Sequence, residues 1–135
     1  MHAQLATDAI RRWYDAMNRR DLDAMGACVT DDFVSRYLGT QGRDAYLQAM
    51  QGMFEAFPDH EGEVLDVVSD GSTVAAHTRQ TGTHQAEFHG IPATGKPVVI
   101  EATDWARVDA DGRLTEHWAH ADNLAMMQQL GVIPE

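Results

Sequence analysis

The spacing of apolar residues along this chain changes near residue 60, and that change limits the folds it can adopt. Before it, Ile10, Trp13, Tyr14 and Met17 follow one another at i, i+3, i+4 and i+7, the stripe of an amphipathic helix. After it, apolar and polar residues alternate with a period of two, which is typical of strands. Helices first and strands afterwards predict an α+β fold, with the helices packed on one face of a sheet.

Capping and turn residues divide each half into elements. We expect a short second helix from Asp21 through Val29, an extended piece at 33–38, and a third helix that Pro58 stops just after Phe57. Short turns separate the later segments, so neighbouring strands should pair antiparallel. The expected strands are 62–69, 73–88, 97–108 and 113–122, with a last helix at 124–130. The sequence therefore predicts one curved sheet, with a cone-shaped pocket between the sheet and its helices.

The composition excludes several classes of protein. A chain of 135 residues is expected to form one domain, residues 1–135, around a single core. Ten basic against 21 acidic residues give a formal charge of −11, which argues against nucleic acid as a partner. Cys28 is the only cysteine, which excludes an internal disulfide and a cysteine metal cluster. No apolar run approaches the roughly 18 residues of a membrane span, and no signal-peptide pattern is present, so we expect a cytoplasmic protein without a membrane partner.

One face of the expected strand 97–108 contains a carboxylate among apolar side chains. Every second residue from Val98 to Val108 is small or branched and apolar, except Asp104, which should therefore point into an apolar space. Carboxylates in such clefts serve general acid/base chemistry, because loss of hydration favours uptake of a proton. The structural alternative is an Asp104 held by backbone amides or an arginine. The sequence leaves both interpretations open.

The next expected strand, 113–122, carries polar residues within reach of the same face. Ala119 is small and leaves space beside His117, so both are expected to line the pocket together with Ala102, although His117 could be purely structural. Asp122, at a strand end, is as well placed to cap the following helix as to act in catalysis. Trp118 lies on the other face of this strand but should be buried, so it is also a candidate for substrate binding.

Three more residues are candidates for substrate binding. Gln80 and His84 share a face with small residues on the expected strand 73–88 and could reach the pocket rim. Tyr14 could direct its hydroxyl into the pocket, an arrangement that stabilises enolates in some enzymes. The histidines lack the i, i+4 helical spacing of a zinc site, so we expect no metal.

Four segments of the second half carry a recognisable pattern: Gly82–Lys96, Thr103–Val108, Asp111–Trp118, and Asp122 followed by Met127–Gly131. With the order of elements, they resemble the SnoaL-like polyketide (ester) cyclases of the NTF2-like superfamily. The resemblance implies an α+β barrel without a cofactor that binds a fused-ring or otherwise apolar small molecule. It also implies ring closure by an intramolecular aldol reaction, with an aspartate as general acid/base and a supporting histidine on the neighbouring strand.

The site residues of the family do not transfer directly. When Arg107 and the pair Glu116–His117 are matched to the cyclase pattern, the family's histidine falls on Asp104 and its catalytic aspartate falls near Ala119. The acid/base role has then moved to Asp104 or Asp122, or the chain does different chemistry or none. Our first choice is Asp104, supported by His117 and Asp122. The alternatives are a non-catalytic small-molecule-binding domain, or an isomerase or epoxide hydrolase on the same fold.

Two further expectations concern the surface and the epoxide hydrolase alternative. Val99, Thr103 and Trp105 would form a partly apolar outer face, which predicts a homodimer with Trp105 at or near the contact. The epoxide hydrolases of this fold resemble an Arg-x-Asp on a mid-barrel strand. Here the strand match is Arg107–Asp109, which runs into a turn.

Overall fold

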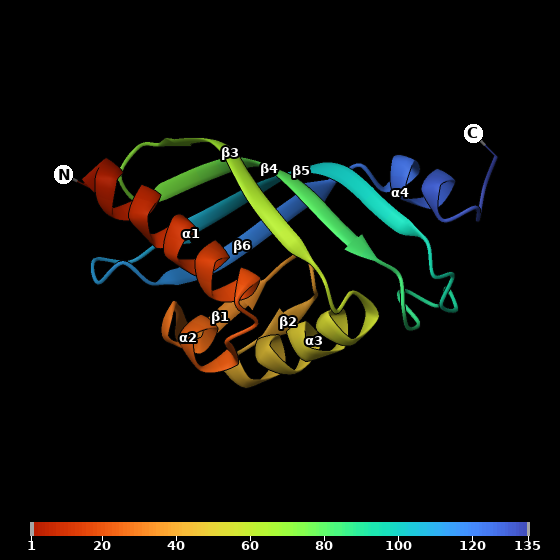
Figure 1. The fold of residues 1–135 in the computed structure, drawn as a ribbon. Helices are drawn as coiled ribbons and strands as arrows, with labels where there is room; N and C mark the ends of the chain where they lie inside the picture. The colour runs from red at the N-terminus through yellow and green to blue at the C-terminus, as the bar shows by residue number, and fades with distance from the viewer. Residues whose placement is uncertain (1, 135) are drawn as a thin grey trace.

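A computed structural model describes residues 2–134, and its elements follow the expected order (Figure 1). The helices are α1 (His2–Asn18), α2 (Leu22–Ala27), α3 (Arg43–Ala56) and α4 (Asn123–Gln129). The strands are β1 (Val29–Ser35), β2 (Thr40–Gln41), β3 (Glu61–Ser69), β4 (Thr73–Thr83), β5 (Pro97–Val108) and β6 (Leu114–Ala121). The change of period near residue 60 coincides with the passage from α3 to β3, and the α+β prediction is confirmed.

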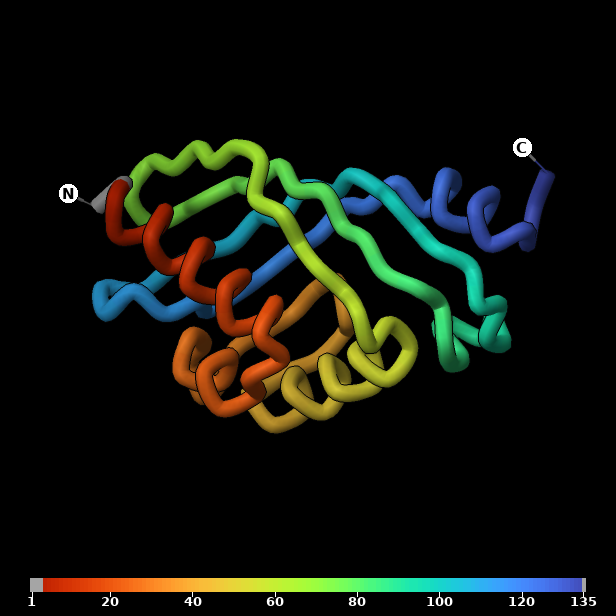
Figure 2. The backbone as a smooth tube through the Cα atoms, in the orientation of Figure 1, coloured from red at the N-terminus to blue at the C-terminus, as the bar shows by residue number. Residues whose placement is uncertain are grey.

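The strands form one open sheet in the order β2-β1-β6-β5-β4-β3. From β3 to β6, consecutive strands pair antiparallel, which confirms the expected meander. Figure 2 shows the long strands β3, β4 and β5 bending along their length, so that the sheet curves rather than lying flat. This curvature gives the sheet a face on which helices can pack and enclose space.

The first strand differs from the expected extended piece at 33–38. α2 ends at Ala27 rather than Val29, and β1 lies parallel to β6, with Val34 opposite Glu116 and Ser35 opposite His117. The expectation was wrong here because the partner of β1 comes from the other end of the chain. No local turn signals a pairing of that kind.

The strand expected at 73–88 also ends early, at Thr83. The His84 N–H still bonds to the Lys96 carbonyl, but the next N–H, of Gln85, bonds to the Ala56 carbonyl at the end of α3. The chain therefore leaves the ladder to contact α3, and the segment from 84 to 96 is a loop between β4 and β5.

The helices cover the sheet unequally. α1 packs against β3, β4 and β5, whereas α3 packs against β1 and β2. The apolar stripe of α1 is buried as expected, with Ile10 0% and Trp13 2% exposed. Trp13 donates a hydrogen bond from Nε1 to the Tyr46 hydroxyl of α3 at 2.8 Å, so the buried indole N–H has a partner. The main core thus lies between α1, α3 and the curved sheet.

A second, smaller apolar cluster lies beside α4. It joins the end of α3 to β5 and α4 through Ala56, Phe57, Val98, Met126 and Leu130. In Figure 1, α4 lies at the end of the molecule opposite the N-terminus. Within residues 2–134, no helix is both long enough and apolar enough to span a membrane.

Candidate active site

Asp104 lies on the buried face of β5, as its place in the alternation predicts. Burial and exposure alternate without a break from Glu101 to Val108, and Asp104 is 4% exposed. On β6, Ala119 is opposite Asp104 and His117 is opposite Ala106, which puts all of these side chains on one face. His117 is also 4% exposed. The register of two neighbouring strands therefore brings a carboxylate and an imidazole together.

Asp104 holds one partner on each carboxylate oxygen. The Nε2 atom of His117 lies 2.6 Å from Oδ1, and the Tyr14 hydroxyl donates a hydrogen bond to Oδ2. Burial, and then the charge of Asp104, raise the pKa of Tyr14 well above its usual value. Tyr14 therefore keeps its proton and acts as a donor. A charged carboxylate can only accept, so in that state of Asp104 the proton between the two groups is on His117 Nε2.

The hydrogen bonds continue from Tyr14 to Gln80 and His60. Tyr14 gives its one proton to Asp104, so its oxygen must accept from Gln80 Nε2, at 3.1 Å. The Gln80 amide is thereby oriented with its carbonyl oxygen 2.6 Å from His60 Nε2, and that nitrogen must carry the proton. Burial lowers the pKa of His60, and nearby Arg20 lowers it further, while the bond to Gln80 acts the other way. His60 is therefore neutral near pH 7.

This polar chain lies in the wall of an apolar cavity of about 120 Å³. Five of the residues singled out in the sequence join Asp104 in lining it: Tyr14, Gln80, Ala102, His117 and Ala119. His60 also lines the cavity and was missed, because it belongs to the turn before β3, where no periodic pattern marks an inward side chain. The polar groups thus converge on one part of an otherwise apolar space.

Four methionines from three helices form much of the remaining wall: Met17, Met50, Met53 and Met126. The cavity is close in size to the ~150 Å³ apolar cavity that accepts benzene, and smaller than the roughly 300–1,000 Å³ of most ligand pockets. Methionine side chains are unbranched and repack easily. A multi-ring molecule would therefore enter by displacing these side chains.

Three residues expected at the site lie elsewhere. His84 is fully buried against Phe57, with ring centroids 5.4 Å apart, and its Nδ1 accepts a hydrogen bond from the Thr94 N–H at 3.3 Å. It anchors the loop between β4 and β5 and does not line the cavity. Its place in the alternation was right, but the chain turns toward α3 immediately after it.

Trp118 and Asp122 are also outside the cavity. Trp118 lies opposite Trp105 on the outer face of the sheet, and the Arg107 guanidinium is 5.7 Å from the centre of its ring. Asp122 is exposed, and its side chain accepts a hydrogen bond from the Ala125 N–H at 3.0 Å, which caps α4. For Asp122 the capping alternative describes the observed geometry.

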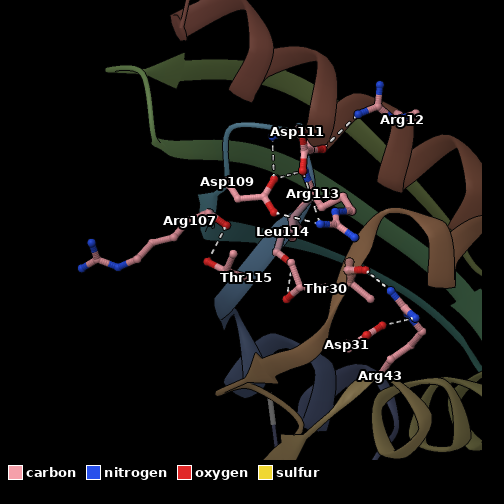
Figure 3. Close-up of polar contacts among 12 residues, drawn as sticks. Arg12, Thr30, Asp31, Arg43, Arg107, Asp109, Asp111, Arg113, Leu114 and Thr115 are labelled. Atoms are coloured by element: carbon pink, nitrogen blue, oxygen red, sulfur yellow. Dashed lines mark hydrogen bonds and ion pairs between the residues drawn. The ribbon is translucent and has the colours of Figure 1, made fainter.

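The Arg107–Asp109 pair lies away from the cavity as well. Figure 3 shows Arg107 extending away from Asp109, which accepts hydrogen bonds within its own turn from the N–H groups of Asp111 and Arg113. Neither residue lines the cavity. The arginine–carboxylate arrangement considered for an epoxide hydrolase is therefore absent from the cavity wall in the part of the chain that the structure describes.

The chain is similar to known proteins over almost its whole length. A family model described as SnoaL-like polyketide cyclase matches residues 7–130. Among solved structures, IdmH, a proposed polyketide cyclase from Streptomyces antibioticus, is 34% identical, with 93% of this chain and 98% of that chain covered and a TM-score of 0.81. No curated protein sequence matches this chain.

Two other solved structures are similar at lower identity. A proposed SnoaL-like polyketide cyclase from Jannaschia sp. CCS1 is 25% identical, with 98% of this chain and 95% of that chain covered and a TM-score of 0.86. AclR, a proposed hydroxylase from Streptomyces galilaeus, is 27% identical, with 96% of this chain and 83% of that chain covered and a TM-score of 0.81. Proteins with this fold thus have more than one proposed activity.

Proposed function

Because the chain belongs to the SnoaL-like polyketide cyclase family, we propose that it is a cofactor-independent cyclase for an apolar polyketide or ester-like small molecule. One observation carries the proposal. A carboxylate that is 4% exposed lies in the wall of an apolar cavity, and its two oxygens are held by an imidazole and a phenol. This arrangement supports general acid/base chemistry on a carbon acid.

Asp104 is the acid/base in this proposal. Each carboxylate oxygen has two acceptor sites, so the bonds from His117 and Tyr14 leave lone pairs free. Asp104 takes a proton from a carbon next to a carbonyl group, and that C–H bond breaks to give an enolate. The enolate carbon then attacks a second carbonyl carbon of the same molecule, forming the ring C–C bond. The resulting alkoxide recovers the proton from Asp104, so atoms and charge balance.

His117 and Tyr14 orient and stabilise the carboxylate. His117 on β6 and Asp104 on β5 supply an imidazole and a carboxylate on neighbouring strands, the two kinds of group that the resemblance to the family implies. The hydrogen bonds from both residues are stronger when the carboxylate is charged and weaker when it is protonated. They therefore favour return of the proton to the product. Asp122 is left with its capping role.

We further propose that the protein forms a homodimer through the outer face of the sheet. Val99 is 54% exposed and Trp105 is 46% exposed on this face of β5. Large apolar side chains left in solvent on a sheet face favour a protein partner.

Deuterium exchange tests the proposed chemistry without knowledge of the natural substrate. Aromatic and multi-ring β-ketoesters would be incubated with the enzyme in D₂O, and exchange at the activated C–H would be measured by mass spectrometry. Asp104→Asn should lower the protein-dependent exchange rate per folded molecule by roughly 10²–10⁴-fold. The matched variant Asp122→Asn keeps a good capping residue and should exchange at the wild-type rate.

The exchange rates of Asp104→Asn and Asp122→Asn distinguish the possible results. Loss of exchange in Asp122→Asn, with retention in Asp104→Asn, would transfer the acid/base role to Asp122. If neither variant changes the rate, or if probes bind without any exchange, the protein is a small-molecule-binding member of the fold and not an enzyme of this class.

A further inference from the structure

Tyr14 reaches Asp104 from a helix, so its position depends on how α1 is attached to the sheet. One helical turn after Tyr14, the side-chain amide of Asn18 binds the backbone of Gly62 in β3 with two hydrogen bonds. Asn18 Nδ2 donates to the Gly62 carbonyl at 2.9 Å, and the Gly62 N–H donates to Asn18 Oδ1 at 2.8 Å. Residues four apart lie on the same side of a helix. The clamp thus fixes the face of α1 from which Tyr14 projects.

Gly62 is also where the Tyr14 ring passes the sheet. A Cβ atom on residue 62 would lie 2.5 Å from Tyr14 Cε1 and 2.8 Å from Cδ1, and 3.1 Å from Gln80 Oε1. Carbon atoms in contact are normally about 3.5–4.0 Å apart. The structure therefore places the phenol ring in the space that any other side chain at residue 62 would fill. The backbone φ of Gly62 is not in the left-handed region. Glycine is therefore needed at this position because of the space that the Tyr14 ring occupies, and not because of the backbone conformation.

The attachment extends to the turn that carries His60. Arg20 donates from Nη2 to the His60 carbonyl at 2.5 Å and from Nη1 to the Asn18 carbonyl at 2.8 Å. The end of α1 is therefore bound to residues 60 and 62, on either side of the first residue of β3. His60 and Gln80 belong to the same series of hydrogen bonds as Tyr14. The attachment of the end of α1 therefore aligns all three side chains.

We propose that Asn18 and Gly62 are positioning residues that hold the Tyr14 hydroxyl on Asp104. This inference rests on the proposed function for its catalytic consequence, but not for its structural one. Asn18 sets the depth and rotation of α1, and Gly62 leaves the gap through which the ring reaches β5. A ring pushed away by about 1 Å stretches its hydrogen bonds toward the ~3.5 Å limit beyond which they fail.

The test compares Gly62→Ala with Gly52→Ala, and Asn18→Ala with Asn18→Asp. Gly52 lies within α3 and a Cβ there would meet nothing within 4 Å, which makes Gly52→Ala the matched control. Asn18→Asp keeps an acceptor for the Gly62 N–H and loses the donor to its carbonyl, so it gives a milder variant that retains part of the clamp. The chain has three tyrosines, so ¹³Cζ-tyrosine NMR resolves Tyr14, which Tyr14→Phe assigns.

We expect Gly62→Ala and Asn18→Ala to shift the Tyr14 resonance and Gly52→Ala to leave it in place. Exchange of the β-ketoester probe should fall roughly 10- to 100-fold in Gly62→Ala, the loss expected for one hydrogen bond to a charged group. In a Tyr14→Phe background, adding Gly62→Ala should lower the rate per folded molecule no further, because both changes act through the same hydroxyl.

Two results would overturn the proposal: an unchanged Tyr14 resonance in folded Gly62→Ala and Asn18→Ala, or an equal rate loss from Gly62→Ala with and without the Tyr14 hydroxyl. Failure of the proposed function itself gives a different result. In that case Asp104→Asn leaves probe exchange unchanged, while the resonance of Tyr14 still reports whether Asn18 and Gly62 position it.

Discussion

The carboxylate of Asp104 is held by groups that differ from both structural partners considered from the sequence. Among the residues that the structure describes, neither a backbone amide nor an arginine binds it; instead His117 and Tyr14 each bind one oxygen. A guanidinium always carries a positive charge, whereas an imidazole can exchange its own proton. This difference between the two kinds of partner is the one that the proposed acid/base role of Asp104 draws on.

Burial of His60 predicts how the stability of the fold changes with pH. Its pKa in the folded protein is lowered below 6.5, so the unfolded chain binds more protons as the pH falls through 6.5. The stability contributed by neutral, buried His60 is present above pH 6.5 and is lost as the pH falls below it. His60→Gln keeps a polar side chain beside Gln80 but cannot take up that proton.

Denaturant melts of wild type and His60→Gln at pH 7 and pH 5 measure this effect. The wild type should lose more free energy of unfolding over this interval, by about 1 kcal/mol for each unit by which the pKa is lowered. His120→Gln, at an exposed position on β6, is the control and should follow the wild type. Parallel curves for wild type and His60→Gln would show that His60 is not buried in the neutral form.

At the scale of elements, α4 packs against β5 and adds one side chain to the cavity wall, through contacts that replace a missing strand. β6 ends at Ala121, so among the described residues no strand pairs with the earlier part of β5 on that side. There the Gln129 side chain accepts from the Val99 N–H at 2.7 Å and donates to the Val99 carbonyl at 2.8 Å. Met126, on the same helix, lines the cavity. Gln129 therefore holds the helix that brings Met126 into the cavity wall.

Gln129→Ala should loosen α4 while leaving the rest of the fold intact. Two hydrogen bonds on an exposed edge contribute about 1–3 kcal/mol to local stability. Hydrogen-exchange mass spectrometry should show faster exchange in residues 97–101 and 123–130, with α1 unchanged. Gln128→Ala, one position earlier, is the matched control, because the Gln128 amide donates to the Pro134 carbonyl. Equal exchange in the two variants would mean that apolar packing alone holds α4.

Local sequence patterns predicted the helices and strands better than they predicted which segments pair or pack together. Alternation along β5 identified the buried face and Asp104, because a strand with one buried face has a fixed period. The parallel pairing of β1 with β6 could not be predicted, because it joins distant segments without a turn between them. His84 shows the same limit: its face was correct, but the contact of Gln85 with α3 ended the strand beside it. The hydrogen bonds from Tyr14 through Gln80 to His60 join α1, β4 and the turn before β3. No single sequence pattern encodes the meeting of these three segments.

At the scale of the molecule, the outer face of the sheet carries one apolar row across four strands. The strand registers place Val68 opposite Ala75, Ala75 opposite Trp105, and Trp105 opposite Trp118. Val68 is 67% and Trp105 is 46% exposed. On either side of this row the face is charged, with Glu101 paired to His77 and Glu116 paired to Arg36. An apolar centre with a polar rim is the usual anatomy of a protein interface.

A twofold axis through this row would bring it against its own copy, as in most homodimers. The formal charge of −11 on each chain opposes that association. Salt screens repulsion between exposed charges beyond about 10 Å at 0.1 M, and it affects apolar contact much less. The dimer is therefore expected to tighten as the salt concentration rises.

Trp105→Lys separates the apolar contact from the overall charge. The substitution adds one positive charge to an acidic chain, so it should strengthen association if charge repulsion were the controlling factor. We expect the reverse, because the lysine removes the largest exposed ring of the row and buries a cation at its centre. Leu124→Lys is the matched control: Leu124 is 61% exposed on α4, outside the row, and its replacement adds the same charge. Sedimentation at micromolar protein should therefore give a dimer for wild type and Leu124→Lys and a monomer for Trp105→Lys. A monomeric wild type at both low and high salt would remove the dimer, and a dimeric Trp105→Lys would move the interface to another face.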